Sequence, residues 1–408
     1  ACRVDDPASI RFHLEQALHL ATQGRPGPVW LDIPIDVQAT QITPDDLPAF
    51  MPPADSLDDP ARIAEYSSLI LEKLSQSSRP VILAGTGVRA GQALAEFEKA
   101  TTALGIPVVT AWTHDLIASD APLYCGRPGT IGTRGGNFVV QNADLLLILG
   151  SRLNIRQTSY NWAGFAPRAI KIQVDIDPAE LRKPTLAIDH PIHCHVRPLL
   201  ADLADRAGRS GHAPWRHREW LSWCRATNGA YPAVQAHHRE FRGRINPYHF
   251  VEILSGCLDQ DDIIACGNAS ACIIPFQAMN IRRGQRLFSN SGSASMGYDL
   301  PAAIGAYYGA LAGRGSQRRV ICLAGDGSVM LNIQELQTIA QNRLPIKVIV
   351  LNNQGYLSIR SSQQNFFGRQ TGAGPESGVT FPDFVAVAKA FGLPGCRLEG
   401  SRFEGDLA

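Results

Sequence analysis

Residues 324–353 read AGDGSVMLNIQELQTIAQNRLPIKVIVLNN, and this stretch decides the fold of the second half of the chain. The apolar run VICLA leads into the first glycine, and a second apolar run, IKVIVL, leads into the two asparagines. Between them, NIQELQTIAQN places Ile333, Leu336, Ile339 and Ala340 on one face of a helix. A strand, a helix and a strand in this order predict a right-handed crossover between two parallel strands.

Polar residues stand at the end of both predicted strands. Parallel strands end at the same edge of a sheet, where open α/β folds bind ligands. Asp326 and Asn353 are 27 positions apart (353 − 326 = 27), and we expect the crossover to bring them close together. A carboxylate, a carboxamide oxygen and a nearby backbone carbonyl suit Mg²⁺. Gly325, Gly327 and Ser328 would let phosphate oxygens approach the backbone and would donate hydrogen bonds to them, so the pattern predicts a diphosphate held through magnesium.

Each motif also has a purely structural interpretation. GDG is a common turn, and NN after a strand is a common start of a loop. Either motif alone favours turn chemistry. Their order and separation together favour a binding site.

Composition excludes several classes of function. The 408 residues include 38 Lys and Arg against 37 Asp and Glu, a formal net charge of +1, which supplies no long-range field for nucleic acid or acidic membranes. The longest apolar runs, such as ADLLLILG at 143–150, are far too short to span a bilayer. The nine cysteines contain no CxxC pair, and we expect reduced thiols in a cytoplasmic protein rather than disulfides.

Strands and helices alternate along most of the chain, which predicts an α/β fold with two parallel-sheet domains and the tail of a third. A helix over 9–22 and a strand over 29–34 form the tail, residues 1–37. A proline-rich linker follows at 38–60. A central nucleotide-binding-like domain is expected at 61–205 and a helical connector at 206–245. The diphosphate-binding domain covers 246–408. The expected strands are 80–85, 106–112, 143–150, 169–177, 261–267, 286–290, 319–327 and 345–353, with helices at 92–105 and 300–313.

Four segments together resemble one enzyme family. GDGS followed by NN resembles the diphosphate-binding signature of thiamine-diphosphate-dependent enzymes. SMGYDLPAAIGA (295–306) resembles the acetolactate synthase branch. GRPGPVWLDIPIDV (24–37) is similar to the close of that family's N-terminal, pyrimidine-binding domain, and FAPRAIKIQVDIDPAEL (165–181) to part of its central domain. We therefore expect an acetolactate synthase large-subunit-like chain that lacks most of the pyrimidine-binding domain and the extreme C-terminus.

The resemblance assigns roles at the strand ends. Asp326 and the side chain of Asn353 would hold Mg²⁺, with the backbone carbonyl of Gly355 as third ligand. Met296 would lie beneath the bent thiamine diphosphate, although a methionine that fills a core gap is the alternative. The glutamate that activates the cofactor lies in the family's N-terminal domain and comes from the opposite subunit. We predict that the 408 residues alone are inactive and that the full-length homodimer or homotetramer is active.

The implied reaction is decarboxylation of a 2-oxo acid, pyruvate, and transfer of its two-carbon unit to a second carbonyl, as in branched-chain amino acid biosynthesis. Acetolactate synthases carry a tryptophan about nine residues after the NN pair, where this chain has Ser362, with Phe366 and Phe367 beyond. This departure motivates the alternative of another acceptor, such as a keto-sugar nucleotide, or of simple decarboxylation. A regulatory subunit is a further implied partner. A non-catalytic relative is the alternative of a different class.

The central domain contains the glycine-rich turn GTGVRAG (85–91), which could admit a nucleotide or serve tight packing. The resemblance implies FAD, near Gly85, Thr86, Gly87, Thr110, Trp112, Gly150, Arg152 and Arg156. Cys194 and His195 stand where the family has Gly-Asp near the adenine. A nicotinamide oxidoreductase would need an acidic residue about 20 positions on, and Glu96 and Glu98 come too early. His193 and His195 could form a metal pair, but no third ligand is apparent.

Overall fold

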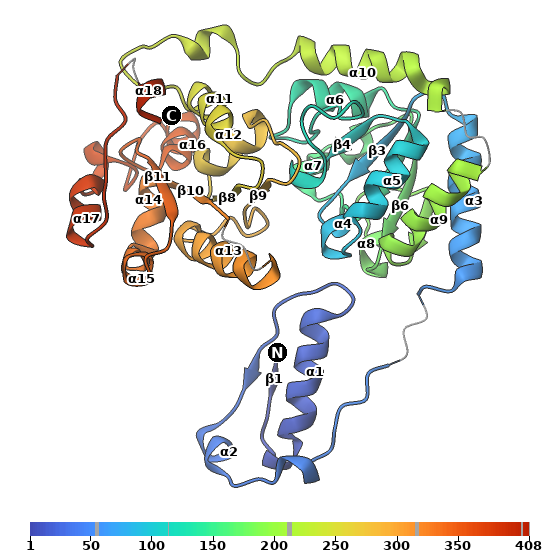
Figure 1. Ribbon diagram of the computed structural model, residues 1–408, viewed down its shortest axis with the longest axis horizontal. Coiled ribbons are helices and arrows are strands. Elements are labelled where there is room, and N and C mark those ends of the chain that lie inside the picture. The colour runs from blue at the N-terminus through green and yellow to red at the C-terminus, as the bar shows by residue number, and fades with distance from the viewer. Residues whose placement is uncertain (54–56, 113, 210–213, 315–317, 401–402, 408) are drawn as a thin grey trace. The chain divides into compact units, whose positions relative to one another are not determined.

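The computed structural model describes residues 1–53, 57–112, 114–209, 214–314, 318–400 and 403–407 (Figure 1). The chain divides into two compact units. One comprises Ala1–Ile106, Asn142–Asn154 and Tyr160–Trp220, and the other comprises Pro107–Gln141, Ile155–Ser159 and Leu221–Ala408.

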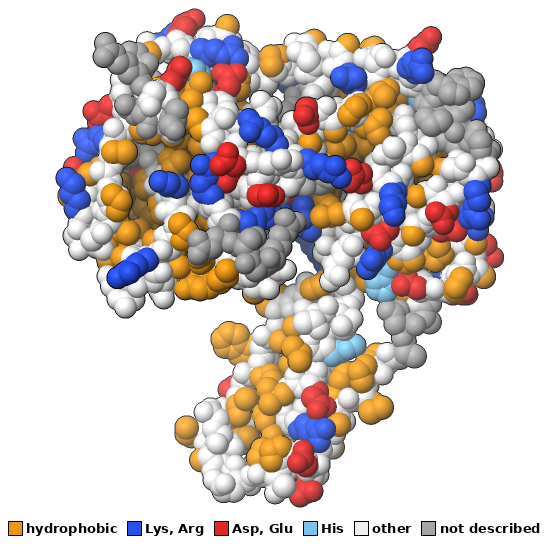
Figure 2. All heavy atoms as spheres, viewed as in Figure 1, with side chains coloured by type: hydrophobic (Ala, Val, Ile, Leu, Met, Phe, Trp, Pro, Cys, Tyr) orange, Lys and Arg blue, Asp and Glu red, His pale blue; other side chains and the backbone are white. Residues whose placement is uncertain are grey.

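The first unit begins with a short parallel strand pair and a helix. Strands β1 (Cys2–Arg3) and β2 (Leu31–Asp32) pair in parallel, and α1 (Ile10–Thr22) lies between them in sequence, followed after β2 by α2 (Ile35–Ala39). The predicted helix is confirmed, whereas the predicted strand at 29–34 shrinks to two residues. Figure 2 shows many hydrophobic side chains at the surface of this segment, and the exposed ones include Leu14, Leu18 and Trp30. Apolar surface gathered in this way is typical of an interface.

The rest of the first unit is built around parallel strands in the order β3-β5-β6-β7. Strands β3 (Pro80–Ala84) and β5 (Leu145–Leu149) are buried at every position, which explains their continuous apolar sequence. The predicted strands at 80–85, 143–150 and 169–177 and the helix at 92–105 are confirmed. The other elements are α3 (Pro60–Gln76), α4 (Gly87–Ala90), α5 (Leu94–Leu104), β6 (Ile170–Asp175), α8 (Pro178–Arg182), β7 (His190–His193) and α9 (Val196–Arg209).

The second unit contains a four-stranded parallel sheet in the order β11-β10-β8-β9. Strand β10 (Val320–Gly325) pairs in parallel with both β8 (Ile263–Cys266) and β11 (Ile346–Leu351), and β9 (Arg286–Phe288) pairs with β8. The crossover predicted from residues 324–353 is therefore confirmed. The predicted helix of the connection is confirmed as α15 (Glu335–Gln341), and two short helical turns, α14 (Asp326–Val329) and η7 (Met330–Asn332), precede it.

Helices cover both faces of this sheet. Along β10, Ile321 and Leu323 pack into one core with α11 (Pro247–Cys257) and α12 (Ser270–Ala278). Val320 and Cys322 alternate with them and pack into the other core with α13 (Asp299–Arg314) and α15. This alternation confirms the two-sided α/β architecture. Further elements of the unit are β4 (Val108–Thr110), α6 (Arg134–Gln141), α7 (Ile155–Thr158), α16 (Leu357–Phe367), α17 (Phe384–Ala390) and α18 (Phe403–Leu407), and α10 (Arg218–Ala230) runs across the division.

The state of the cysteines and the lengths of the helices agree with what the sequence predicts. All nine cysteines are free thiols, and six of them are buried. Among the described residues, every helix is too short or too polar to cross a membrane.

Candidate functional site

The carboxyl ends of β8, β10 and β11 meet at one edge of the second sheet. Gly325 at the end of β10 is the register partner of Leu351 in β11. The backbone N–H of Gly267, just after β8, donates to the carbonyl of Leu323 at 2.8 Å. The residues that follow these strands are thus held side by side, as Figure 1 shows for the strands themselves.

Asp326 is the centre of this edge. Its side chain is only 2% exposed. One carboxylate oxygen, Oδ1, accepts a hydrogen bond from the backbone N–H of Gly327 at 2.7 Å. The other, Oδ2, accepts from the backbone N–H groups of Asn353 at 3.0 Å and Gly355 at 3.1 Å. The crossover therefore brings the three expected metal-binding residues, Asp326, Asn353 and Gly355, into one hydrogen-bonded group.

Arg360, at the end of the first turn of α16, contacts the same group and was not singled out from the sequence. Its Nη2 donates to the backbone carbonyl of Asn353 at 2.9 Å and to the Oδ1 of that side chain at 3.2 Å. The sequence signal that could have identified it is a single cation placed seven positions after Asn353, in the helix that follows the NN pair.

The glycines at this edge serve different purposes. A Cβ on Gly325 would meet no atom within 4 Å, so packing does not require glycine there, and the open space suits a close ligand. A Cβ on Gly327 would lie 2.2 Å from the ring of Tyr356. Gly355 has φ +152°, and its Cβ would lie 2.3 Å from the carbonyl oxygen of Ala373. Of these three glycines, Gly325 is the one with open space at the position of an added Cβ.

The segment around Met296 is tied to the turn after β10. The N–H of Gly297 donates to the hydroxyl of Ser328 at 2.9 Å, and the side-chain amide of Asn332 donates to the carbonyl of Gly297 at 2.7 Å. Met296 itself is half-buried. Ser328, in α14, is thus bonded to the residue next to Met296, so the two expected cofactor-binding residues belong to one connected region.

Asp299, the first residue of α13, is a buried acid in the same region that sequence reasoning missed. It is fully buried, and its Oδ1 accepts from the N–H of Leu300 at 3.1 Å. Burial raises the pKa of Asp299, and hydrogen bonds from Ser328 and from the backbone of Leu300 oppose that rise. A Cβ on Gly267 would lie 2.8 Å from its Oδ2, so the end of β8 passes close to this carboxyl group.

The glycines expected to contact a flavin are explained by packing within the first unit. A Cβ on Gly85 would lie 2.4 Å from the carbonyl oxygen of Gly150, and a Cβ on Gly87 would lie 2.6 Å from the Cα of Gly150. The N–H of Gly87 also donates to that carbonyl at 2.9 Å. Two loops at the carboxyl ends of β3 and β5 pack directly against each other, with Thr86 between the first two glycines.

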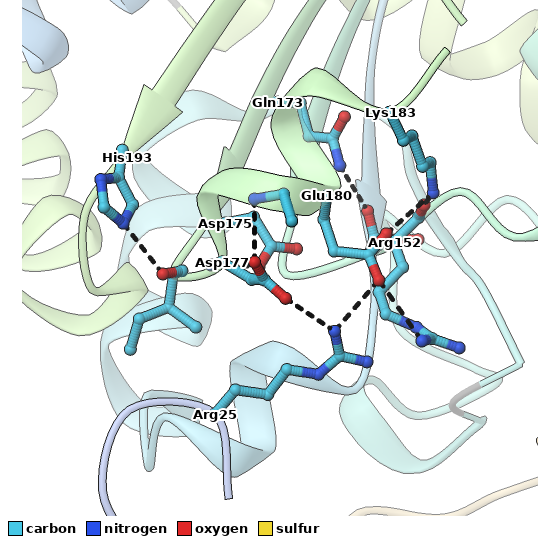
Figure 3. A network of polar contacts seen from close by, with 11 residues as sticks. Arg25, Arg152, Gln173, Asp175, Asp177, Glu180, Lys183 and His193 are labelled. Atoms are coloured by element: carbon cyan, nitrogen blue, oxygen red, sulfur yellow. Dashed lines mark hydrogen bonds and ion pairs between the residues drawn. The ribbon is translucent and has the colours of Figure 1, made fainter. Parts of the chain in front are cut away.

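Arg152 belongs to the network of polar contacts in Figure 3, which is centred on Glu180. The Glu180 carboxylate pairs with Arg152 at 3.3 Å, with Arg25 at 3.0 Å and with Lys183 at 3.0 Å. Lys183 also donates to the backbone carbonyl of Arg152. Burial raises the pKa of Glu180, but hydrogen bonds from Lys183 and Arg25 outweigh it and leave that pKa below the ordinary value.

The remaining flavin candidates lie in the second unit. Thr110 is buried at the end of β4. Trp112 stacks on Phe276, with ring centroids 5.1 Å apart. The backbone carbonyl of Arg156 accepts from the N–H of Thr130 at 2.7 Å. The eight candidates are therefore divided between the two compact units.

The two histidines of the HxH motif have different partners. His193 contacts the carbonyl of Ile176 at 2.9 Å, and His195 Nδ1 contacts Asp58 at 2.9 Å. In the described parts of the chain, no group of three or more His, Cys, Asp or Glu could hold a metal ion. The motif therefore shows no metal-binding arrangement there.

Comparison with known proteins gives matches in both units. Residues 68–203 match the family described as thiamine pyrophosphate enzyme, central domain, and residues 267–407 match the thiamine pyrophosphate enzyme C-terminal TPP binding domain. The chain is 33% identical to a probable chloroplastic acetolactate synthase 2 of Oryza sativa subsp. japonica, over 97% of this chain and 59% of the relative. It is 32% identical to the acetolactate synthase large subunit of Cyanidium caldarium (98% and 67%) and to the isozyme 1 large subunit of Escherichia coli K12 (94% and 65%). The chain thus spans 59 to 67% of the length of these relatives.

Proposed function

Because the chain belongs to the thiamine pyrophosphate enzymes, we propose that it carries the cofactor-binding part of a Mg²⁺-dependent enzyme that decarboxylates pyruvate and transfers the two-carbon unit to a second carbonyl. The relatives named acetolactate synthase motivate this reaction. The observation that carries the proposal is the buried Asp326 carboxylate, which accepts hydrogen bonds from the backbones of both Asn353 and Gly355.

The residues at this edge would divide the work of binding. Asp326, the Oδ1 of Asn353 and the carbonyl of Gly355 are hard oxygen donors of the kind that Mg²⁺ prefers. The open space at Gly325 suits the close approach of a phosphate group, and Ser328 holds the Met296 segment through the N–H of Gly297. Bound thiamine diphosphate would supply the carbanion chemistry, since it acts as nucleophile and electron sink.

Isothermal titration of the full-length protein with thiamine diphosphate tests the proposal. We expect heat of binding only when Mg²⁺ is present, and none for Asp326→Ala, because that variant loses the anionic ligand. Asp120→Ala, at an exposed surface position, is the control and should bind as the wild type does. Absence of metal-dependent binding by the wild type would sink the proposal and favour a non-catalytic relative.

The acceptor substrate is the part of the proposed reaction for which this chain differs from acetolactate synthases, through the residues of α16. Ser362 is exposed on α16, and Phe366 and Phe367 are 81% and 75% exposed on the same helix. A small residue in place of the bulky tryptophan leaves room for a larger acceptor, such as a keto-sugar nucleotide. We expect Ser362→Trp to shift the products of a mixed-acceptor assay toward those made from the smaller 2-oxo acid acceptor. A free aldehyde as the product, formed when the two-carbon unit is protonated and not transferred, would indicate simple decarboxylation. An unchanged product ratio would remove the reason for proposing a different acceptor.

The contacts of Gly85, Gly87 and Arg152 give no independent support for a bound flavin, whereas the buried Oγ1 of Thr110 has no hydrogen-bond partner among the described residues. Backbone atoms fill the space beside Gly85 and Gly87, and Arg152 already pairs with Glu180. We therefore derive no step from FAD. The visible absorbance of the purified full-length protein tests this point, since a flavin band would show that FAD binds despite these contacts. A nicotinamide oxidoreductase is not supported, because the same glycines have a packing role.

The assembly proposed is a homodimer or homotetramer in the cytoplasm, together with a regulatory subunit. The relatives of Cyanidium caldarium and Escherichia coli are named large subunits, which motivates the regulatory partner. Light scattering of the full-length protein, alone and after co-purification from its native source, would measure both associations. A monomer that is fully active would contradict the proposed assembly.

A further inference from the structure

Arg360 is held in place by the structure around it. Its backbone N–H donates to the carbonyl of Tyr356 at 2.9 Å, which closes the first turn of α16. Its guanidinium passes beside Gly374, where an added Cβ would lie 3.4 Å from Nη1. The Nε atom is buried and has no hydrogen-bond partner among the described residues. Burial of Nε without a partner costs free energy, so the hydrogen bonds of the rest of the guanidinium must hold the side chain in this position.

The hydrogen bonds of the Arg360 side chain run from Nη2 to Asn353. Nη2 donates both to the backbone carbonyl and to the Oδ1 of Asn353, at 2.9 and 3.2 Å. A guanidinium only donates, so it is satisfied by the carboxamide oxygen and is repelled by the amide NH₂ of a rotated Asn353. The contact therefore selects one rotamer of Asn353 and one orientation of its carboxamide.

The loop that carries Asn353 is held from two sides. On one side Asp326 accepts from the N–H groups of Asn353 and Gly355. On the other side Arg360 donates to Asn353, and the N–H of Tyr356 donates to the carbonyl of Ala373 at 2.9 Å. An oxygen with two lone pairs can accept from Arg360 and still offer the second lone pair to a cation. The arrangement is therefore compatible with a metal ligand at Oδ1.

We propose that Arg360 is a positioning residue that orients the carboxamide oxygen of Asn353 toward the metal of the metal–diphosphate complex. The proposal rests on the proposed function, since it concerns the same site. The guanidinium charge opposes a nearby free cation but favours the diphosphate anion, so the effect belongs to the ternary complex. Groups that orient metal ligands in this way commonly change metal affinity by about 10- to 100-fold when they are removed.

Binding of Mn²⁺, followed by electron paramagnetic resonance in the presence of saturating thiamine diphosphate, tests the proposal on the full-length protein. We expect Arg360→Met to weaken Mn²⁺ binding by about tenfold or more. Arg360→Lys keeps the charge but shortens the reach to Asn353, and should lie between Arg360→Met and the wild type. Arg369→Met, at an exposed position just after α16, is the matched control and should bind as the wild type does.

A second measurement distinguishes a local loss of order at Asn353 from general misfolding of the variant. Hydrogen exchange of the apoprotein should show faster exchange at the amides of Asn353 and Gly355 in Arg360→Met, with the strands of the sheet unchanged. Equal or tighter Mn²⁺ binding by Arg360→Met, with the wild type binding normally, would overturn the positioning role alone. Failure of the wild type to bind Mn²⁺ with thiamine diphosphate would overturn the proposed function and the role of Arg360 together.

Discussion

Asp299 is a fully buried acid, and burial raises its pKa above the ordinary carboxyl value. The folded state then holds this proton more tightly than the unfolded chain does. The contribution of protonated Asp299 to the free energy of unfolding is therefore fully present below the unfolded pKa of about 3.9, and it is lost as pH rises through the folded pKa. The cost is about 1.4 kcal/mol for each unit by which the pKa is raised.

Asp299→Asn removes this titration and keeps an oxygen that can accept from Leu300. We predict that the variant is more stable than the wild type at pH 8, and that the gain shrinks toward pH 4. Thermal unfolding at several pH values measures the difference, with the exposed Asp120→Asn as control. A gain that is the same at pH 4 and pH 8 would show that ionisation of Asp299 does not limit stability.

Gly355 combines a backbone requirement with a steric one. Its φ of +152° is rare for residues with a side chain, and an added Cβ would lie 2.3 Å from the Ala373 carbonyl oxygen. We predict that Gly355→Ala lowers the free energy of unfolding by about 1–3 kcal/mol and weakens metal-dependent cofactor binding. Gly368→Ala is the comparison, because it also has positive φ (+65°) but no atom within 4 Å of the added Cβ. Equal unfolding free energies for the two variants would exclude the clash with Ala373 as the cause.

Among the elements, η7 links the turn after β10 to the segment that precedes α13. Its last residue, Asn332, donates to the carbonyl of Gly297 at 2.7 Å. We predict that Asn332→Ala lowers thermal stability only slightly, by about 1 kcal/mol, but weakens thiamine diphosphate binding severalfold, because the Met296 segment loses the hydrogen bond to Gly297. Titration calorimetry compares it with Asn342→Ala, whose side-chain amide donates to the carbonyl of Thr338 in the helix that it ends. Wild-type affinity in Asn332→Ala would mean that the remaining contacts, those of Ser328 with Gly297 and of Asn268 with Ala294, are sufficient to hold the segment.

Across the first unit, Glu180 connects residues that are far apart in sequence, since Arg25, Arg152 and Lys183 all pair with it. The pKa of Glu180 is lowered, so its stabilisation is present above the ordinary carboxyl pKa and is lost as pH falls through the lowered value. We predict that Glu180→Gln destabilises the protein by about 1 kcal/mol at neutral pH in low salt, and by less in high salt. Thermal unfolding at two salt concentrations measures this. A salt-independent loss would point to packing instead of charge.

Much of the fold could be predicted because it depends on short-range patterns. Strands buried on both faces, such as β3 and β5, read as continuous apolar runs, and α1, α5 and α13 show helical spacing. Strand β7, HPIH, buries only Ile192, so its sequence carries no strand signal and its pairing with β6 identifies it. The helix predicted at 332–342 is present as α15, whereas α14 and η7, which precede it, carry no helical signal in the sequence and are tied to Gly297 through Ser328 and Asn332.

The linear order of residues 324–353 was enough to specify a parallel crossover and hence the proximity of Asp326 and Asn353, because both follow from strand direction and handedness. It could not specify which groups satisfy the lone pairs of those side chains. Arg360, the buried Asp299 and the contact of Gly85 with Gly150 emerge only in three dimensions, since each depends on distances between segments that no local pattern encodes. Close packing and the burial of charge are properties of the folded chain, and they decide how this sheet edge is built.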